Sequence, residues 1–164
     1  MKNRVAYFGV FVALALIFSY VETMIPFQIG IPGVKLGLAN LIVVIALYKT
    51  DVKEALLLSV TRVVLSGFIF GNLASILYSL AGGLVSLAVM ALLKKYADLS
   101  IIGVSVAGGV FHNIGQLVVA AIVVETYSVT GYLPVLLVAG LITREGVGTV
   151  EPEMIRRLRN IDLR

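Results

Sequence analysis

Cysteine and tryptophan are absent from the sequence, histidine occurs once, and charged residues make up only 13% of the 164 residues. Without cysteine, the chain can form no disulfide, no cysteine-ligated zinc site and no iron–sulfur cluster. A single histidine argues against a multi-histidine metal site. The charged fraction is about half of what soluble domains carry. This excludes an ordinary cytosolic protein, and also a disordered chain, which needs high charge and low hydrophobicity.

Apolar residues are abundant instead, at 60% of the chain, with a mean hydropathy of +1.06. A helix crosses the hydrocarbon core of a bilayer with about 20 residues, so six such helices would use about 120 residues. The long apolar runs lack the polar–apolar alternation of outer-membrane barrel strands. We therefore expect an all-α polytopic membrane protein, with a six-helix transmembrane domain over residues 1–150 and a charged cytoplasmic tail over residues 151–164.

The apolar runs and the polar turns between them predict the helix boundaries. The first run is long for the apolar core of a signal peptide. The connection that follows it contains two prolines and two glycines, which mark a non-helical segment. The charged tail is expected to form a short interfacial helix. The six membrane helices are expected over residues 5–21, 36–48, 54–70, 73–93, 101–124 and 132–147.

The basic residues predict the orientation in the membrane. Ten of the thirteen Lys and Arg residues fall on one side if the N-terminus is cytoplasmic, as the positive-inside rule requires. Lys35 alone lies in an outer connection, while Arg62 and Arg144 lie within helices. Both termini are therefore expected in the cytoplasm. The net charge of +4 then reflects membrane topology, and no nucleic-acid partner is expected.

Arg62 lies near the middle of an expected membrane helix. A charge inside a bilayer is costly, so an intramembrane arginine is by default a functional hypothesis. Ser59 and Ser66 share its helix face, at i−3 and i+4. The alternative is a structural arginine whose guanidinium is satisfied by backbone carbonyls, and the residue pattern leaves both interpretations open.

A second polar group lies on the helix expected over 101–124, where His112, Asn113 and Gln116 are close in sequence. His112 and Gln116 are four residues apart and share a face. A single polar residue would fit an interhelical hydrogen bond worth about 0.6–2 kcal/mol; three together favour the lining of a cavity. A lone histidine without neighbouring carboxylates is a poor metal ligand set, so no metal site is predicted.

The segment 32–40, with the sequence PGVKLGLAN, is a candidate anion site at the start of the second helix. Its glycines free backbone N–H groups near a helix N-terminus, Lys35 adds positive charge, and Asn40 lies at the helix start. An interfacial loop with a snorkelling Lys35 would explain the same residues. On the first helix, the small residues Gly9 and Ala13 permit close helix approach, either within the chain or with a docked partner subunit.

Known enzyme motifs are missing. The sequence contains no nucleotide-binding glycine loop, no GxGxxG and no aspartate-rich diphosphate motif. None of the nine acidic residues forms a carboxylate cluster in an expected membrane segment, so metal-assisted chemistry on a diphosphate lacks its usual ligands. No catalytic residue is predicted, and the residues favour a non-enzymatic role.

Four features together resemble one bacterial family, labelled heptaprenyl diphosphate synthase component I and also called the Gx transporter family. They are the segment 32–40, Arg62, the segment 79–86 and the segment 103–116. The resemblance implies a fold similar to the six-helix substrate-binding S-components of energy-coupling-factor (ECF) transporters, in the bacterial inner membrane. Small residues on the first helix of S-components dock the coupling subunit, a pattern to which Gly9 and Ala13 correspond in part.

The function that these residues and this resemblance favour is a membrane subunit that holds a small anionic or amphipathic ligand and delivers it inward with partner subunits. One alternative is an accessory subunit of prenyl diphosphate or menaquinone metabolism. Another is a subunit of an extracellular electron-transfer system that binds flavin or quinone. The residues expected to contact the ligand are Lys35, Asn40, Arg62, His112, Asn113 and Gln116.

Overall fold

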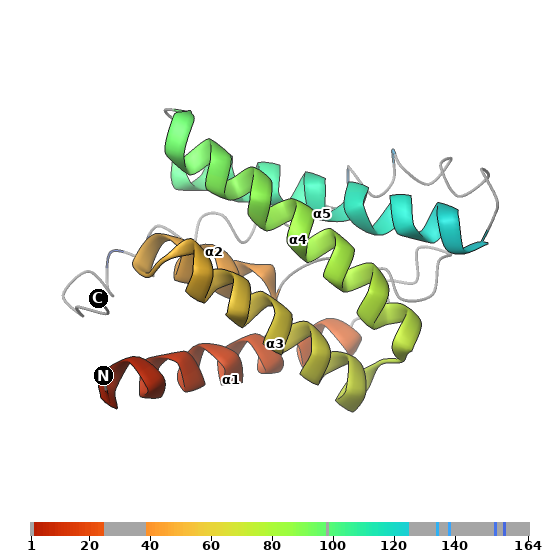
Figure 1. Ribbon diagram of the computed structural model, residues 1–164, viewed down its shortest axis with the longest axis horizontal. Coiled ribbons are helices and arrows are strands. Elements are labelled where there is room, and N and C mark those ends of the chain that lie inside the picture. Colours follow the sequence, from red (N-terminus) through yellow and green to blue (C-terminus); the bar gives the residue numbers. More distant parts are fainter. Residues whose placement is uncertain are drawn as a thin grey trace.

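A computed structural model of the chain describes residues 2–24, 39–97 and 99–124, together with the isolated helical positions Pro134, Val138, Glu153 and Arg156. The three continuous ranges contain five helices and no strand, so the all-α prediction is confirmed for them (Figure 1). The helices are α1 (Lys2–Met24), α2 (Asn40–Lys49), α3 (Val52–Phe70), α4 (Leu73–Tyr96) and α5 (Ile101–Val124). Apart from the isolated positions, the sixth expected helix and the tail lie outside the described residues.

Three of these helices are long and apolar enough to cross a membrane: Val5–Met24 in α1, Leu73–Tyr96 in α4 and Ile101–Val123 in α5. The chain is therefore a multi-pass membrane protein. The helix α2 has only 10 residues. At 1.5 Å per residue it extends about 15 Å, half the thickness of a hydrocarbon core of about 30 Å.

The turn between α3 and α4 shows how local sequence sets the helix ends. Gly71 ends α3, and Asn72 begins α4 with a capping box. The Asn72 side-chain oxygen accepts a hydrogen bond from the Ser75 backbone N–H at 2.8 Å, and the Asn72 backbone N–H donates to Ser75 Oγ at 3.2 Å. These bonds satisfy amide groups that a helix start leaves without intrahelical partners. A turn this short makes α3 and α4 antiparallel neighbours.

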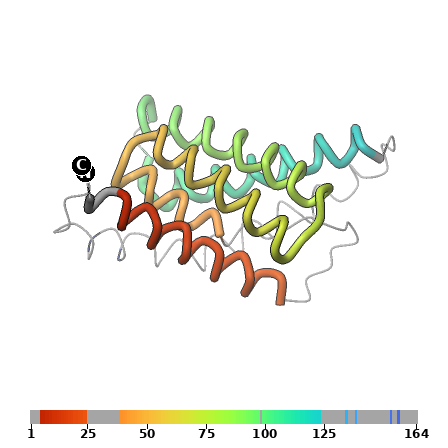
Figure 2. Tube along the Cα trace, turned by 60° about the horizontal axis from the view of Figure 1, so that its bottom comes forward, coloured from red at the N-terminus to blue at the C-terminus, as the bar shows by residue number. Residues whose placement is uncertain are grey.

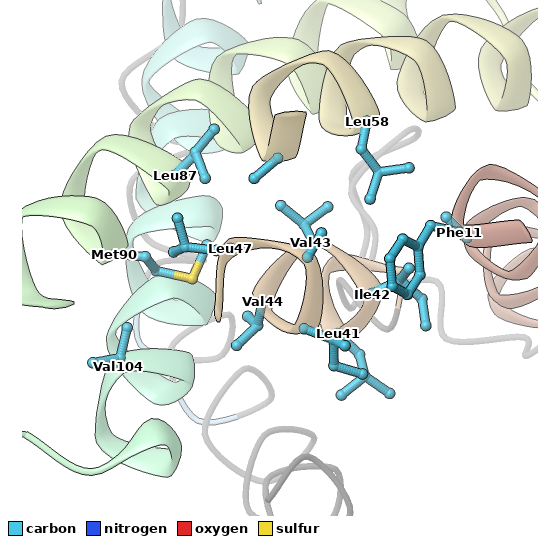
Figure 3. Close-up of a cluster of buried hydrophobic side chains, with 14 residues drawn as sticks. Phe11, Leu41, Ile42, Val43, Val44, Leu47, Leu58, Leu87, Met90 and Val104 are labelled. Atoms are coloured by element: carbon cyan, nitrogen blue, oxygen red, sulfur yellow. The ribbon is translucent and has the colours of Figure 1, made fainter. Parts of the chain in front are cut away.

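The short helix α2 forms the centre of the hydrophobic core. Every residue from 40 to 47 is buried, as expected for a helix that is apolar on all sides. Figure 3 shows its side chains surrounded by Phe11 of α1, Leu58 of α3, Leu87 and Met90 of α4, and Val104 of α5. All four other helices thus contribute to the environment of α2.

Lys94 of α4 fixes the C-terminal end of α2. Its ammonium donates a hydrogen bond to the backbone carbonyl of Leu47 at 2.5 Å and lies 4.9 Å from the centre of the Tyr48 ring. A cation favours both the free carbonyls at a helix C-terminus and an aromatic face. This contact anchors α2 against the last turn of α4.

The helix α1 lies at one edge of the bundle in both Figure 1 and Figure 2. It contacts α2 and α3. Only 17% of its apolar stretch is buried, against 44% in α4 and in α5. Large apolar side chains such as Val10, Ile17, Phe68 and Ile122 are exposed, as a lipid-facing surface requires.

Glycines let α4 and α5 approach closely along their length. A Cβ atom at Gly115 would lie 2.9 Å from Gly82 Cα, and one at Gly82 would lie 2.6 Å from the backbone oxygen of His112. No side chain fits at either position without displacing the neighbouring backbone. Small residues therefore bring these two helices together, as helix packing in lipid favours.

Candidate functional site

Polar side chains from several helices are buried inside the bundle, and we call this set of residues the polar column. Each of its members is exposed by no more than 6%, and they come from four helices. Such residues are costly in the interior of a membrane protein and mark candidate functional sites. The polar column consists of Asn40 of α2, Ser59 and Arg62 of α3, Ser79 and Ser86 of α4, and His112, Asn113 and Gln116 of α5.

On the α5 side of the polar column, the side chains of His112 and Gln116 lie against Gly82 of α4. A Cβ atom at Gly82 would be 3.1 Å from His112 Cε1 and 2.8 Å from Gln116 Cγ. The missing side chain of Gly82 therefore provides the space in which both polar side chains lie. The prediction that His112 and Gln116 share one helix face is consistent with this arrangement.

On the α3 side, two contacts fix how α3 and α4 are aligned. A Cβ atom at Gly83 would lie 3.1 Å from Ser59 Oγ, and Gly67 lies against the side chain of Ile76. Gly82 and Gly83 are adjacent in α4. This helix therefore contacts polar residues of α5 at Gly82 and Ser59 of α3 at Gly83.

These contacts place three polar residues at about the same height in the bundle. Arg62 follows Ser59 by one turn on α3, which brings it level with the turn of α4 that contains Ser79. On the other side of α4, a Cβ atom at Gly115 would lie 3.0 Å from the backbone oxygen of Ala81, so Gln116 lies at this height too. We call Arg62, Ser79 and Gln116 the Arg62 layer.

Asn40 joins the polar column from the first residue of α2. Its amide nitrogen donates a hydrogen bond to Ser86 Oγ at 3.1 Å, in a fully buried contact between α2 and α4. Ser86 follows Ser79 by seven residues, about two turns of α4, so Asn40 lies at a different height from the Arg62 layer.

Several polar atoms of the column have no hydrogen-bond partner within the described part of the chain. They are Asn40 Oδ1, Ser79 Oγ and both amide atoms of Gln116, all buried. Leaving a buried polar group without a partner costs about 1–3 kcal/mol. Such atoms are candidates for contacts with a bound molecule.

The structure brings some of the expected site residues together and leaves others apart. Asn40, Arg62, His112, Asn113 and Gln116 all belong to the polar column, with α2, α3 and α5 each in contact with α4. Whether they form one ligand site remains a prediction. The remaining expected ligand residue, Lys35, lies outside the described residues.

Gly9 and Ala13 lie apart from the polar column, on the exposed side of α1. A Cβ atom at Gly9 would meet no atom within 4 Å among the described residues. Among the described residues, Gly9 therefore makes no close contact with another helix. The surface that it shares with Ala13 is exposed in this part of the chain.

Glu22 is a buried acidic residue that the sequence interpretation placed in a connection. The expected end of the first helix at residue 21 was too early, because α1 continues to Met24. Ala15, Ser19 and Glu22 are all buried and recur at helical spacing on one face. This spacing continues the buried face of α1 through Glu22. A proline disfavours helix at the residue before it, and Pro26 follows Met24 by two residues, so the helix can extend to Met24.

A hollow between α1, α2 and α3 lies apart from the polar column. It is found at the end of the bundle where α2 ends and α3 begins, and no expected ligand residue lines it. Its lining is mainly apolar and aromatic, and consists of Tyr7, Phe8, Phe11, Ala46, Thr50, Glu54 and Leu58.

The comparison with protein families assigns the chain to one family. The family model of heptaprenyl diphosphate synthase component I matches residues 11–154, which is most of the sequence. The chain belongs to this family. The resemblance inferred from the sequence motifs is thereby confirmed, and the family name describes one component of a multi-subunit synthase. The searches of curated proteins and of solved structures gave no match.

Proposed function

We propose that this family member is a non-catalytic membrane subunit that binds a small anionic or amphipathic molecule among the residues of the polar column. With partner subunits, it would deliver this molecule across or within the membrane. The observation that carries the proposal is the burial of Arg62, only 5% exposed, at the height of Ser79 and Gln116. A buried positive charge in an apolar bundle suits an anionic group on a largely apolar molecule.

The positive charge of Arg62 supports an anionic ligand. Arg62 is the basic residue of the polar column and is buried. Placing an arginine at the centre of a membrane helix costs about 2.5–3.5 kcal/mol on insertion scales, and a bound anion would offset this free energy. The first turn of α2, which starts at the buried Asn40, adds backbone N–H groups whose partial positive charge favours anions in the same way.

The neutral members of the column would orient the ligand. Asn40 Oδ1, Ser79 Oγ and the Gln116 amide are buried and available for hydrogen bonds. His112 and Asn113 lie on the same stretch of α5. Lys35, which precedes α2 in sequence, would add a second positive charge.

The proposal is tested by identifying what the protein retains on purification. The chain is purified in mild detergent, its small molecules are extracted, and mass spectrometry compares the native chain with Arg62→Ala. We expect an anionic molecule on the native chain and its loss from the variant. Lys53→Ala is the matched control, because Lys53 is a basic residue of the same helix but is exposed. An equal amount of the molecule on Arg62→Ala would contradict the proposed role of Arg62.

A second candidate function follows from the family name. As a component of a multi-subunit synthase, the chain could serve as an accessory membrane subunit of prenyl diphosphate or menaquinone metabolism. A prenyl diphosphate combines an anionic head with a long apolar tail, which also fits a charged group inside an apolar bundle. The extract distinguishes the alternatives: a prenyl diphosphate or menaquinone supports the accessory role, and a flavin supports an electron-transfer subunit.

A further inference from the structure

Gln116 is the least satisfied side chain of the polar column. It is fully buried, and neither its amide nitrogen nor its amide oxygen has a hydrogen-bond partner among the residues that the structure describes. The close contact of its Cγ with Gly82 restricts the position of the side chain. A primary amide in this state presents a donor and an acceptor side by side.

Ser79 adds a second pair of hydrogen-bonding functions in the same layer. Its hydroxyl is buried and has no hydrogen-bond partner in the described ranges. It precedes Gly82 by three residues on α4, and therefore lies one turn from the residue that Gln116 contacts. A hydroxyl both donates and accepts hydrogen bonds, so Ser79 can bind either a donor or an acceptor of a ligand group that Gln116 contacts.

We propose that Gln116, supported by Ser79, recognises a planar group of the ligand that presents an N–H donor beside a carbonyl acceptor, such as a lactam, an imide or a primary amide. The inference rests on the proposed function and names the chemistry of a second part of the ligand, away from the anionic group assigned to Arg62. A carboxamide pairs with such an edge through two parallel hydrogen bonds, as glutamine does with adenine.

Other ligand chemistries satisfy Gln116 less well. An anionic group accepts hydrogen bonds only, and so does a quinone carbonyl, so each would leave the amide oxygen of Gln116 without a donor. An apolar chain would satisfy neither amide atom. Because an unsatisfied buried group costs about 1–3 kcal/mol, a donor–acceptor edge is the group that this side chain favours.

Three matched probes test the inference on the full chain in detergent. The probe 2-quinolone presents an N–H beside a carbonyl. N-methyl-2-quinolone has nearly the same shape but lacks the donor, and 1,4-naphthoquinone carries acceptors only. Binding is measured by probe fluorescence for the quinolones and by thermal stabilisation for all three. We expect the native chain to bind 2-quinolone at least about fivefold more tightly than the other two, because it alone satisfies both the donor and the acceptor of the Gln116 amide.

Two variants connect the preference to Gln116. Gln116→Met keeps the length of the side chain but removes both amide atoms, so it should bind 2-quinolone and its N-methyl derivative equally. Val118→Ala is the control, because Val118 is exposed on the same helix and should leave the preference unchanged. Equal binding of the probes to the native chain, no binding of any of them, or a preference that survives in Gln116→Met would each overturn the inference.

The outcome is separable from that of the proposed function. A native chain that retains an anion through Arg62 but shows no preference for 2-quinolone leaves the proposed function intact and rejects the role of Gln116. A chain that prefers 2-quinolone but retains no anion supports the role of Gln116 and rejects the proposed role of Arg62. The comparison of probes on the native chain decides the inference even if Gln116→Met does not fold.

Discussion

At the scale of single residues, Arg62 differs from the other basic residues of α3 and α4. Lys53, Lys94 and Lys95 lie near helix ends and are exposed, whereas Arg62 is buried between polar neighbours. A guanidinium keeps its charge in almost any protein environment. Whatever surrounds it must therefore supply hydrogen-bond acceptors or negative charge.

The first prediction compares substitutions of Arg62 in both binding and stability. Arg62→Lys keeps the charge but loses the planar, five-donor geometry, so it should recover only part of the ligand retention lost in Arg62→Ala. Arg62→Ala should fold with an unchanged or higher melting temperature in the absence of ligand, because the cost of the buried charge is removed. Thermal unfolding followed by circular dichroism, with and without the extracted molecule, measures both. A variant that binds normally but melts far lower would instead identify Arg62 as a structural hydrogen-bonding residue.

The second prediction concerns glycine at the contact of α4 and α5. In Gly82→Ala the new Cβ would lie 2.6 Å from a backbone oxygen, so the helices must separate and stability should fall by about 1–3 kcal/mol. Gly9→Ala is the matched control. It adds the same methyl group at a position where no atom of the described residues lies within 4 Å, and should be neutral or stabilising by up to about 1 kcal/mol. Equal melting temperatures for the two variants would show that the close contact is unimportant.

At the scale of helices, α1 and α2 occupy opposite environments. All residues from 40 to 47 of α2 are buried, whereas most of the apolar stretch of α1 is not. Both sequences are apolar, and neither shows a strong one-sided pattern. The difference comes from position, because α2 is surrounded by the other helices and α1 lies at the edge of the bundle (Figures 1 and 2).

The third prediction is that the exposed side of α1 docks a membrane partner. Gly9→Leu and Ala13→Leu place bulky side chains on a surface that is exposed in the described part of the chain, so the melting temperature of the isolated protein should not fall. Close helix approach by a partner would be blocked. Affinity purification from native membranes should then recover less partner subunit than with the native chain. Ile17→Leu, a substitution of similar volume on the same exposed side, is the control. Unchanged recovery with both Leu variants would reject docking at this surface.

At the scale of the whole molecule, the described helices form a bundle with apolar side chains on its exterior, and with both a hydrophobic core and polar side chains in its interior. Large apolar side chains of α1, α3, α4 and α5 are exposed, while serines and amides are buried. Exposed apolar side chains suit a protein in lipid, because lipid tails are as apolar as these side chains. Bound molecules would then meet polar groups only inside the bundle.

The fourth prediction concerns topology. The distribution of Lys and Arg predicts that both termini are in the cytoplasm, so a cytoplasmically active reporter fused after Arg164 should be active, and one inserted near Ser128 should not. A reporter that is active only outside the cytoplasm should give the opposite pattern at the two sites. Cytoplasmic activity near Ser128 would contradict the assigned orientation and the direction from which a ligand reaches the polar column.

The sequence was a good guide to those helices that are set by local signals. Apolar length predicted α4 and α5 closely, and the Gly71-Asn72 pair predicted the turn before α4, because a capping box depends on neighbouring residues alone. The end of α1 was misplaced, since continuation of its helix through Glu22 depends on a buried face that only neighbouring helices provide.

Composition alone determined that this chain is an all-α membrane protein, and local spacing determined which polar residues share a helix face. The physical reason is that hydropathy and helical periodicity are properties of continuous segments. Tertiary structure decided that Gly82 lies against His112 and Gln116, that Asn40 donates to Ser86, and that Arg62 lies at the height of Gln116. These relations join residues from different helices, and they depend on how closely glycines allow the helices to approach.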